Sequence, residues 1–292
     1  MASPWLLLLF IASYAHGRAP SQRAKWKDPG AGGGGNSRSV RQAVSKKAAA
    51  GVVATHVVPF KLPGSPPVEV SVTEVCDRAW WDRQSETAGS NPFGAKLWPG
   101  SLAVAEYLAR LPAEEVGALR VLELGCGNGL CSLTAASRGA TVIASDVSKV
   151  ALNLMSTAAE SQGLDIEALT FDLGSSAALP DAELIVVGDL LYDASLAVLV
   201  ANRVAEATNR GTWVVVGTHK LAGRETFLKR LSALTTRGNG AAGERPALAE
   251  FTVQGAVKSP ALKWKEKRTV VLHLNTPEWA VPAIDGSRSV EI

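Results

Sequence analysis

The sequence predicts an α/β fold in which helices cover both faces of a doubly wound, mostly parallel sheet. From Leu119 onward, short runs rich in β-branched residues alternate with amphipathic stretches of helical length. A glycine-rich turn joins the first run directly to the helix that follows it. Right-handed crossovers connect strands and helices that alternate in this way, and they make the strands parallel. With 47% hydrophobic and 20% charged residues, the 292-residue chain can bury a full core.

Five strands and four helices are expected in this alternating region. The strands are the runs 120–124, 140–145, 166–171, 184–187 and 212–216, and the helices are 129–138, 148–162, 195–209 and 224–235. Beyond them, the runs 251–254 and 268–274 are joined by a lysine-rich connection without a helix, so we expect them to pair antiparallel at one edge. The predicted fold class is a Rossmann-like doubly wound sheet, mostly parallel, with an antiparallel C-terminal edge strand.

Three regions are expected along the chain: a leader at 1–51, an N-terminal extension at 52–111 and the main α/β domain at 112–292. Within the extension, residues 68–75 alternate in polarity as a strand does. The segment Trp98-Pro-Gly-Ser101 then leads into a helix at 102–111, for which Ser101 is the expected N-cap.

The leader combines two kinds of targeting sequence. Its apolar run, 5–12, is much shorter than the ~20 residues of a membrane-spanning helix and is followed by small residues, as in a signal peptide. Residues 18–51 are basic, almost free of acid and expected to be disordered. This order resembles the two-part presequence of algae whose plastids lie inside the secretory system, so plastid import is favoured. Secretion, a mitochondrial destination, a short membrane anchor and a wrongly assigned first exon stay open.

The charge distribution limits the expected partners. Residues 1–68 hold nine Lys and Arg residues and one acid, which leaves 21 basic and 26 acidic residues in the remainder. Because the body is therefore acidic, we expect no nucleic-acid partner. We also expect no stable membrane span and a monomer. Three cysteines form neither an even disulfide framework nor paired metal ligands, which favours a reducing compartment.

The strongest motif is the segment Val121-Leu-Glu-Leu-Gly-Cys-Gly-Asn-Gly129, a strand that runs through three glycines into a helix. Glycine suits a sharp turn that a ligand approaches closely. Dinucleotide sites use G-x-G-x-x-G, whereas Gly125, Gly127 and Gly129 are spaced G-x-G-x-G. Glu123 would repel a pyrophosphate but could orient a cationic ligand.

Two further strand ends complete a ligand pocket. Asp146 ends the second strand, 21 residues after Gly125, where a carboxylate can accept hydrogen bonds from both ribose hydroxyls. The third strand ends in Phe171-Asp172, which offers an apolar surface for a purine and an acceptor for its exocyclic amine. An adenosine ligand without phosphates fits this set.

These residues resemble the S-adenosylmethionine pocket of seven-strand class I methyltransferases, over roughly residues 95–275. Asp189-Leu-Leu-Tyr192 resembles the D-x-x-Y motif of the protein-lysine branch of that family. Trp98-Pro-Gly100 resembles the W-P-G segment of its electron-transfer-flavoprotein β-subunit lysine methyltransferase subgroup.

The resemblance implies S-adenosyl-L-methionine as cofactor, a protein substrate with a lysine side chain as acceptor, and methyl transfer to its neutral amine. It implies catalytic roles for Asp189 and Tyr192 and no metal. The cofactor-binding residues that it implies are Trp98, Glu123, Gly125, Gly127, Gly129, Asp146, Asp172 and Asp189.

Other interpretations stay open at this point. A small-molecule N- or O-methyltransferase on the same fold is the main alternative. A nicotinamide-dependent oxidoreductase is opposed by the glycine spacing and Glu123, and an inactive cofactor-binding module is not excluded. His219 follows the fifth strand and could accept a proton. Cys126 and Cys131 are expected to pack rather than react.

Overall fold

The computed structural model describes residues 53–60, 62, 66–86, 92–219, 221–235, 247–254, 266–283 and 288–291. All of them belong to one compact unit that extends from Arg41 to Ile292, so the ranges 52–111 and 112–292 share that unit. The leader expected at 1–51 lies outside the described residues.

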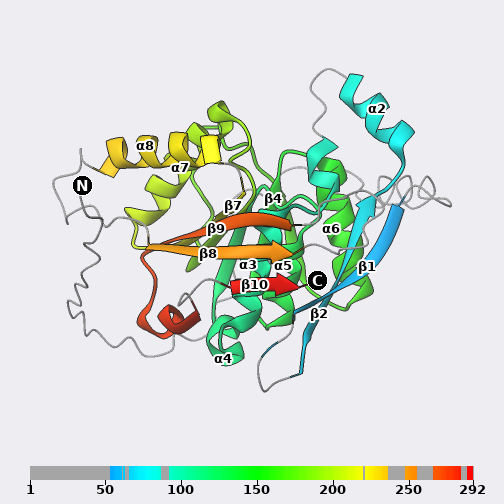
Figure 1. Cartoon of the computed structure of the whole chain (residues 1–292), viewed down its shortest axis with the longest axis horizontal. Helices are drawn as coiled ribbons and strands as arrows, with labels where there is room; N and C mark the ends of the chain where they lie inside the picture. Colours follow the sequence, from blue (N-terminus) through cyan, green and yellow to red (C-terminus); the bar gives the residue numbers. More distant parts are fainter. Residues whose placement is uncertain are drawn as a thin grey trace, which may run out of the picture. The chain divides into compact units, whose positions relative to one another are not determined.

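The centre of the fold is an eight-stranded sheet in the order β10-β8-β9-β7-β6-β3-β4-β5 (Figure 1). The strands are β3 (Arg120–Leu124), β4 (Thr141–Asp146), β5 (Ile166–Thr170), β6 (Leu184–Gly188), β7 (Trp213–Thr218), β8 (Ala247–Gln254), β9 (Glu266–Leu274) and β10 (Arg288–Glu291). Five neighbouring strands of the sheet are parallel: β7, β6, β3, β4 and β5. Strand β9 pairs antiparallel with both β7 and β8. The predicted fold class is confirmed.

The C-terminal edge contains one strand more than the sequence indicated. β10 pairs parallel with β8 and lies outside it. The antiparallel strand β9 lies between β7 and β8, and the strand at the edge is β10.

Helices cover both faces of the sheet. They are α2 (Arg78–Glu86), α3 (Pro99–Arg110), α4 (Ala113–Gly117), α5 (Leu130–Ser137), α6 (Lys149–Ser161), α7 (Ala194–Thr208) and α8 (Leu221–Thr235), with 3₁₀ turns η1 (Pro92–Ala95) and η2 (Glu278–Ala283). Alternate strand residues pack to opposite sides, since Val121 joins one hydrophobic core with α3, α5 and α6 while Leu122 joins a second with α7 and α8. The sheet is therefore doubly wound.

A separate hairpin of β1 (Val53–Phe60) and β2 (Val68–Val75) packs on this body. The strand expected at 68–75 is confirmed, whereas β1 was not expected. The buried side chains of Val58, Phe60, Val70 and Val72 join the core shared by α5 and α6.

One residue of the hairpin reaches the segment that leads into α3. The carboxylate of Glu74 is fully buried, accepts a hydrogen bond from the backbone N–H of Leu97 and lies 3.0 Å from Nε2 of His56. Leu97 directly precedes Trp98. The hairpin therefore fixes the backbone at the start of the W-P-G segment.

The start of α3 differs from the expectation. The helix begins at Pro99, two residues before Ser101, and its N-cap Trp98 makes no side-chain cap. The N–H of Gly100 is instead accepted by the carboxylate of Asp189, at 2.8 Å. The prediction of Ser101 as N-cap is wrong because the cap comes from a distant strand end rather than from a neighbouring residue.

Removing residues 1–51 should leave both stability and cofactor affinity unchanged, because their composition supports no core and β1 begins only at Val53. Thermal unfolding and calorimetry of a chain that begins at Val52 would check this. A chain that begins at Val68 is the matched comparison, and it should be destabilised because it loses the buried Val58 and Phe60. A large loss of thermal stability or of cofactor affinity in the chain that begins at Val52 would contradict the prediction.

No helix in the described ranges is both long enough and apolar enough to cross a membrane.

Candidate functional site

A cleft opens where β3, β4, β5 and β6 reach their carboxyl ends. It encloses about 770 Å³ outside the protein atoms, including open solvent at its mouth. Parallel α/β sheets bind ligands at this edge. Seven of the residues that the sequence indicated line the cleft together: Trp98, Gly125, Gly127, Asp146, Asp172, Asp189 and Tyr192.

The glycine loop has the backbone conformation that requires glycine. Gly125, Gly127 and Gly129 have φ angles of +65°, +55° and +82°. A Cβ on Gly127 would also lie 3.1 Å from the carbonyl oxygen of Gly94, so the loop and η1 approach each other closely. Gly129 does not line the cleft but ends the turn as the N-cap of α5.

Asp146 connects the loop to the end of β4. One carboxylate oxygen accepts from the N–H of Gly127 at 2.9 Å, and the other accepts from the N–H of Ser148 at 2.8 Å. Burial raises the pKa of this carboxyl, while the two backbone hydrogen bonds act in the opposite direction. The side chain thus holds the glycine loop and also faces the cleft.

Glu123 is not brought into the cleft. Its buried carboxylate accepts from both the backbone N–H and the hydroxyl of Ser132, in the first turns of α5. Burial raises the pKa of Glu123 to about 7. Glu123 therefore connects β3 to α5 through these hydrogen bonds. It does not contact the cleft, where the sequence suggested that it would orient a cationic ligand.

Glu123→Gln should make folding stability less dependent on pH. Because the folded pKa of about 7 exceeds the reference value of 4.5, the folded protein binds this proton more tightly, and the stability that it contributes is lost as the pH rises from about 4.5 through about 7. Urea unfolding of both proteins at several pH values would measure this. The free energy of unfolding of the Glu123→Gln variant minus that of the native chain should rise across the window, and parallel profiles would contradict the assignment.

Asp189 follows β6 with a left-handed backbone, at φ +59°. Its buried carboxylate accepts a hydrogen bond from the backbone N–H of Gly100 and another, at 3.1 Å, from the backbone N–H of His219. The carboxylate oxygens also lie 2.6–2.7 Å from Nδ1 of the His219 ring. A Cβ on Gly100 would lie 2.7 Å from Cγ of Asp189 and 2.9 Å from the carbonyl oxygen of Gly217. These contacts explain the W-P-G segment. The proline begins helix α3, and the glycine has no Cβ, so the Asp189 carboxylate can approach the positive N-terminal end of that helix.

His219, whose role the sequence left open, lies against this carboxylate. A carboxylate accepts only from a protonated ring nitrogen, so Nδ1 carries a hydrogen, and in the neutral ring the lone pair is then on Nε2. The imidazole is nearly parallel to the indole of Trp98, at 8° and 6.5 Å between centroids. His219 itself does not line the cleft, but it contacts two residues that do.

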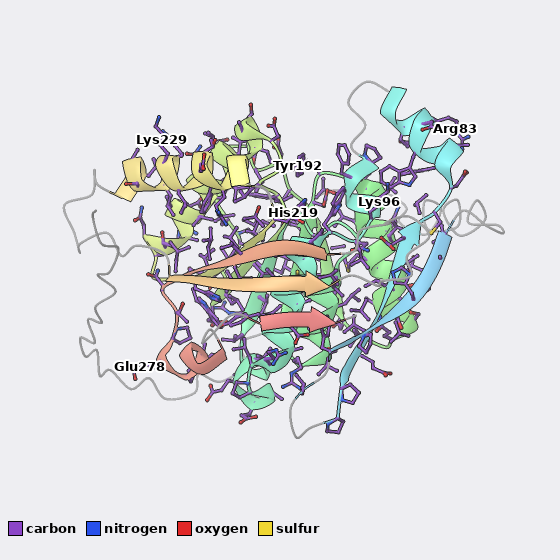
Figure 2. All side chains as sticks on the ribbon, in the orientation of Figure 1. Arg83, Lys96, Tyr192, His219, Lys229 and Glu278 are labelled. Carbon is purple, nitrogen blue, oxygen red and sulfur yellow. The ribbon has the colours of Figure 1, made fainter. Side chains whose placement is uncertain are left out.

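Aromatic side chains cluster at the mouth of the cleft. Nε1 of Trp98 donates to the carbonyl oxygen of Phe93 at 2.8 Å, and the Phe93 ring lies 6.2 Å from Trp98 and 5.7 Å from Tyr192. In the view of Figure 2, the labelled side chains of Tyr192, His219 and Lys96 gather in the same region. Tyr192 is exposed, so its hydroxyl can meet an incoming molecule.

Phe171 and Asp172, the two residues expected at the purine end of the cleft, differ in exposure. Phe171 is buried, and the guanidinium of Arg203 lies 5.1 Å from its ring centroid. Asp172 is exposed, and its carboxylate accepts from the N–H of Gly174 at 2.8 Å. Both line the cleft, as the sequence indicated.

The lining residues that the sequence did not indicate include two polar ones, Asn128 and Lys96. Asn128 is buried, and its Nδ2 has no hydrogen-bond partner in the described part of the chain. Lys96 lines the cleft with its ammonium 3.8 Å from the Trp81 ring centroid. The position of Asn128 between two loop glycines could have indicated it, whereas nothing near Lys96 in sequence distinguished that residue.

Cys126 and Cys131 are buried, as expected. Burial raises the pKa of both thiols well above the usual range, which makes them unreactive.

A family model described as "Lysine methyltransferase" matches residues 83–233, just over half of the chain. The chain belongs to the lysine methyltransferase family. The match spans every site residue that the sequence indicated, from Trp98 to Tyr192, and His219 as well.

Curated relatives of this lysine methyltransferase family member are named electron transfer flavoprotein beta subunit lysine methyltransferase. The Danio rerio protein is 31% identical over 147 residues, covering 50% of this chain and 56% of the relative. The Xenopus laevis protein is 33% identical over 152 residues, covering 50% and 59%. The chain spans about half the length of the curated relatives it matches.

Among solved structures, a T. thermophilus 16S rRNA N2 G1207 methyltransferase in complex with AdoMet and guanosine is similar at a TM-score of 0.44. It is 18% identical, and the similarity covers 75% of this chain and 50% of that one.

Proposed function

We propose that this protein is an S-adenosylmethionine-dependent protein-lysine N-methyltransferase. The observation that carries the proposal is the position of Asp189, the first residue of D-x-x-Y, whose carboxylate lies in the cleft wall between the positive end of α3 and His219. Membership of the lysine methyltransferase family and the names of the relatives support it.

The cleft has the features that S-adenosylmethionine requires. The residues that would hold it are Asp146 and Asp172, the glycine loop, and the Phe171 surface. Gly127 lets the loop lie against η1, where a Cβ would come within 3.1 Å of the carbonyl oxygen of Gly94, and Asn128 lines the cleft with its Nδ2 unpaired in the described part of the chain. When bound, S-adenosylmethionine supplies a sulfonium methyl group to a neutral nucleophile.

The chain's own residues prepare the acceptor. A lysine amine has a reference pKa near 10.4, so it arrives protonated and must lose a proton before it can react. Because His219 does not itself line the cleft, the proton reaches its Nε2 through an intervening water, and the Asp189 carboxylate on Nδ1 stabilises the resulting imidazolium. Trp98, Phe93 and Tyr192 lie together at the mouth, where a bound acceptor would cover them and reduce the access of water.

The test is to incubate the purified protein with radiolabelled S-adenosylmethionine and either a cell lysate or purified electron-transfer-flavoprotein β subunit. Label on a lysine, located by mass spectrometry, is the expected result, and the Asp189→Asn variant is the negative control. Label confined to small-molecule fractions would favour the alternative, a small-molecule N- or O-methyltransferase.

Tyr192→Phe should lower turnover by about fivefold, on the basis of ~1 kcal/mol for one lost hydrogen bond to the acceptor. The affinity for S-adenosylmethionine should stay nearly unchanged, because the ring and its contact with Phe93 remain. Single-turnover rates at saturating cofactor would measure the effect. Full activity of this variant would remove Tyr192 from the catalytic assignment.

We further propose import into a plastid through residues 1–51, on the basis of their composition. Fusion of these residues to a fluorescent protein would test this, with fluorescence in the secretory pathway or mitochondrion as the contrary outcomes.

A further inference from the structure

We propose that exposed apolar side chains at the mouth of the cleft form a docking surface for the protein acceptor, and that they contact apolar residues that flank its target lysine. This inference rests on the proposed function. The apolar rim consists of Phe93, Val147, Val150 and Tyr192.

Exposure distinguishes these residues from the rest of the described chain. Five large apolar residues are strongly exposed there: Val57 at 53%, Val147 at 50%, Phe93 at 49%, Tyr192 at 41% and Val150 at 40%. Four of the five belong to the rim, and only Val57 lies elsewhere, on the hairpin strand β1. Single exposed apolar residues are ordinary, but a cluster of them indicates an interaction site.

Three of the four rim residues line the cleft, although the rim comes from separate segments. Phe93, Val147 and Tyr192 line the cleft, and the rings of Phe93 and Tyr192 are 5.7 Å apart. Val150 lies in the first turn of α6, beside Ala151, whose Cβ is 3.0 Å from the position of a Cβ on Gly94. The start of α6 thus abuts η1, which carries Phe93.

The exposure of the rim favours a macromolecular occupant. A small acceptor enclosed in the cleft would leave Val150 uncovered, because this residue does not line the cleft. A lysine on a protein surface enters by its side chain, so its backbone and flanking residues must stay at the mouth, against the rim.

The charges near the rim indicate how the partner is bound. Lys96 and Asp172 line the cleft, while Lys149 and Asp193 are neighbours of Val150 and Tyr192 in the sequence. Because both signs are present, charge alone does not select a strongly acidic or basic partner. Apolar contacts at the centre with mixed charges around them match the usual organisation of a protein interface.

The experiment measures the initial rate of radiolabel incorporation into lysate protein, at saturating S-adenosylmethionine and limiting acceptor. Val150→Ser and the double variant Val147→Ser/Val150→Ser should lower this rate, the double variant by about tenfold, as expected for truncated anchor residues. Val150→Ile, which keeps an apolar side chain, should restore it. Val57→Ser is the matched control and should label protein at the native rate.

The outcomes separate the two proposals. If the native protein labels no protein at all, the proposed function fails and the docking inference with it. If it labels protein and Val150→Ser does so equally well, only the docking inference is overturned. Calorimetry with S-adenosylmethionine should give the same affinity for Val150→Ser as for the native chain, and a loss of affinity would also overturn the inference. So would sedimentation of the native chain as a dimer that Val150→Ser dissociates, because the rim would then bind a second copy.

Discussion

Asp189→Asn should reduce methyl transfer on the order of 100-fold, the lower range for loss of a proton-transfer group. Asparagine keeps an oxygen that can accept from Gly100 N–H, and it tolerates the left-handed backbone that Asp189 adopts at φ +59°. It lacks the negative charge that stabilises a protonated His219. The variant should therefore fold normally and lose the chemical step.

Single-turnover rates at saturating S-adenosylmethionine would separate this loss from weaker cofactor binding. His219→Ala is the companion variant. If the two residues act as a unit, the double variant should be no slower than the slower single variant. An Asp189→Asn rate within about twofold of the native rate, far from the expected factor, would contradict the mechanism.

Asp146→Ala should weaken S-adenosylmethionine binding by one to two orders of magnitude. A hydrogen bond to a charged group contributes ~1.5–3 kcal/mol, and this carboxylate faces the cleft while it also holds the N–H of Gly127. Calorimetry measures the change directly, and thermal unfolding establishes that the variant is folded.

Asp172→Ala is the control for that experiment. Asp172 lines the same cleft, but it is exposed and satisfied in part by Gly174, so its loss should reduce affinity less. Equal effects of the two substitutions, or unchanged affinity in a folded Asp146→Ala variant, would contradict the assignment of Asp146 to the ribose hydroxyls.

The sheet could be predicted closely where local pattern and burial agree. β3 has the predicted bounds because Val121, Leu122 and Leu124 are buried apolar residues that point to both faces of the sheet, and because a glycine follows the strand. The carboxyl ends of parallel strands meet at one edge, and this is why Asp146, Asp172 and Asp189 could be assigned to one site from the sequence.

The missed features depend on contacts between distant residues. The cap of α3 comes from Asp189 rather than Ser101, and Asp189 is 89 residues from the N–H that it accepts. Glu123 was expected in the cleft because a carboxylate beside glycines suggests a ligand, but Ser132 on the next helix satisfies it. The hairpin strand β1 contains Pro59 and alternates poorly in polarity, so its partner β2 was found without it.

The buried carboxylate of Glu74 has a consequence for local unfolding. If the backbone around Leu97 moved away while the hairpin stayed in place, this carboxylate would lose its N–H donor inside the core, which is costly. The hairpin and the segment before α3 are therefore coupled as one cooperative opening unit. In amide hydrogen exchange, the N–H of Leu97 should exchange at the rate of the paired amides of β2. Reagents or temperatures that loosen the hairpin would then expose the cleft well below the midpoint of global unfolding.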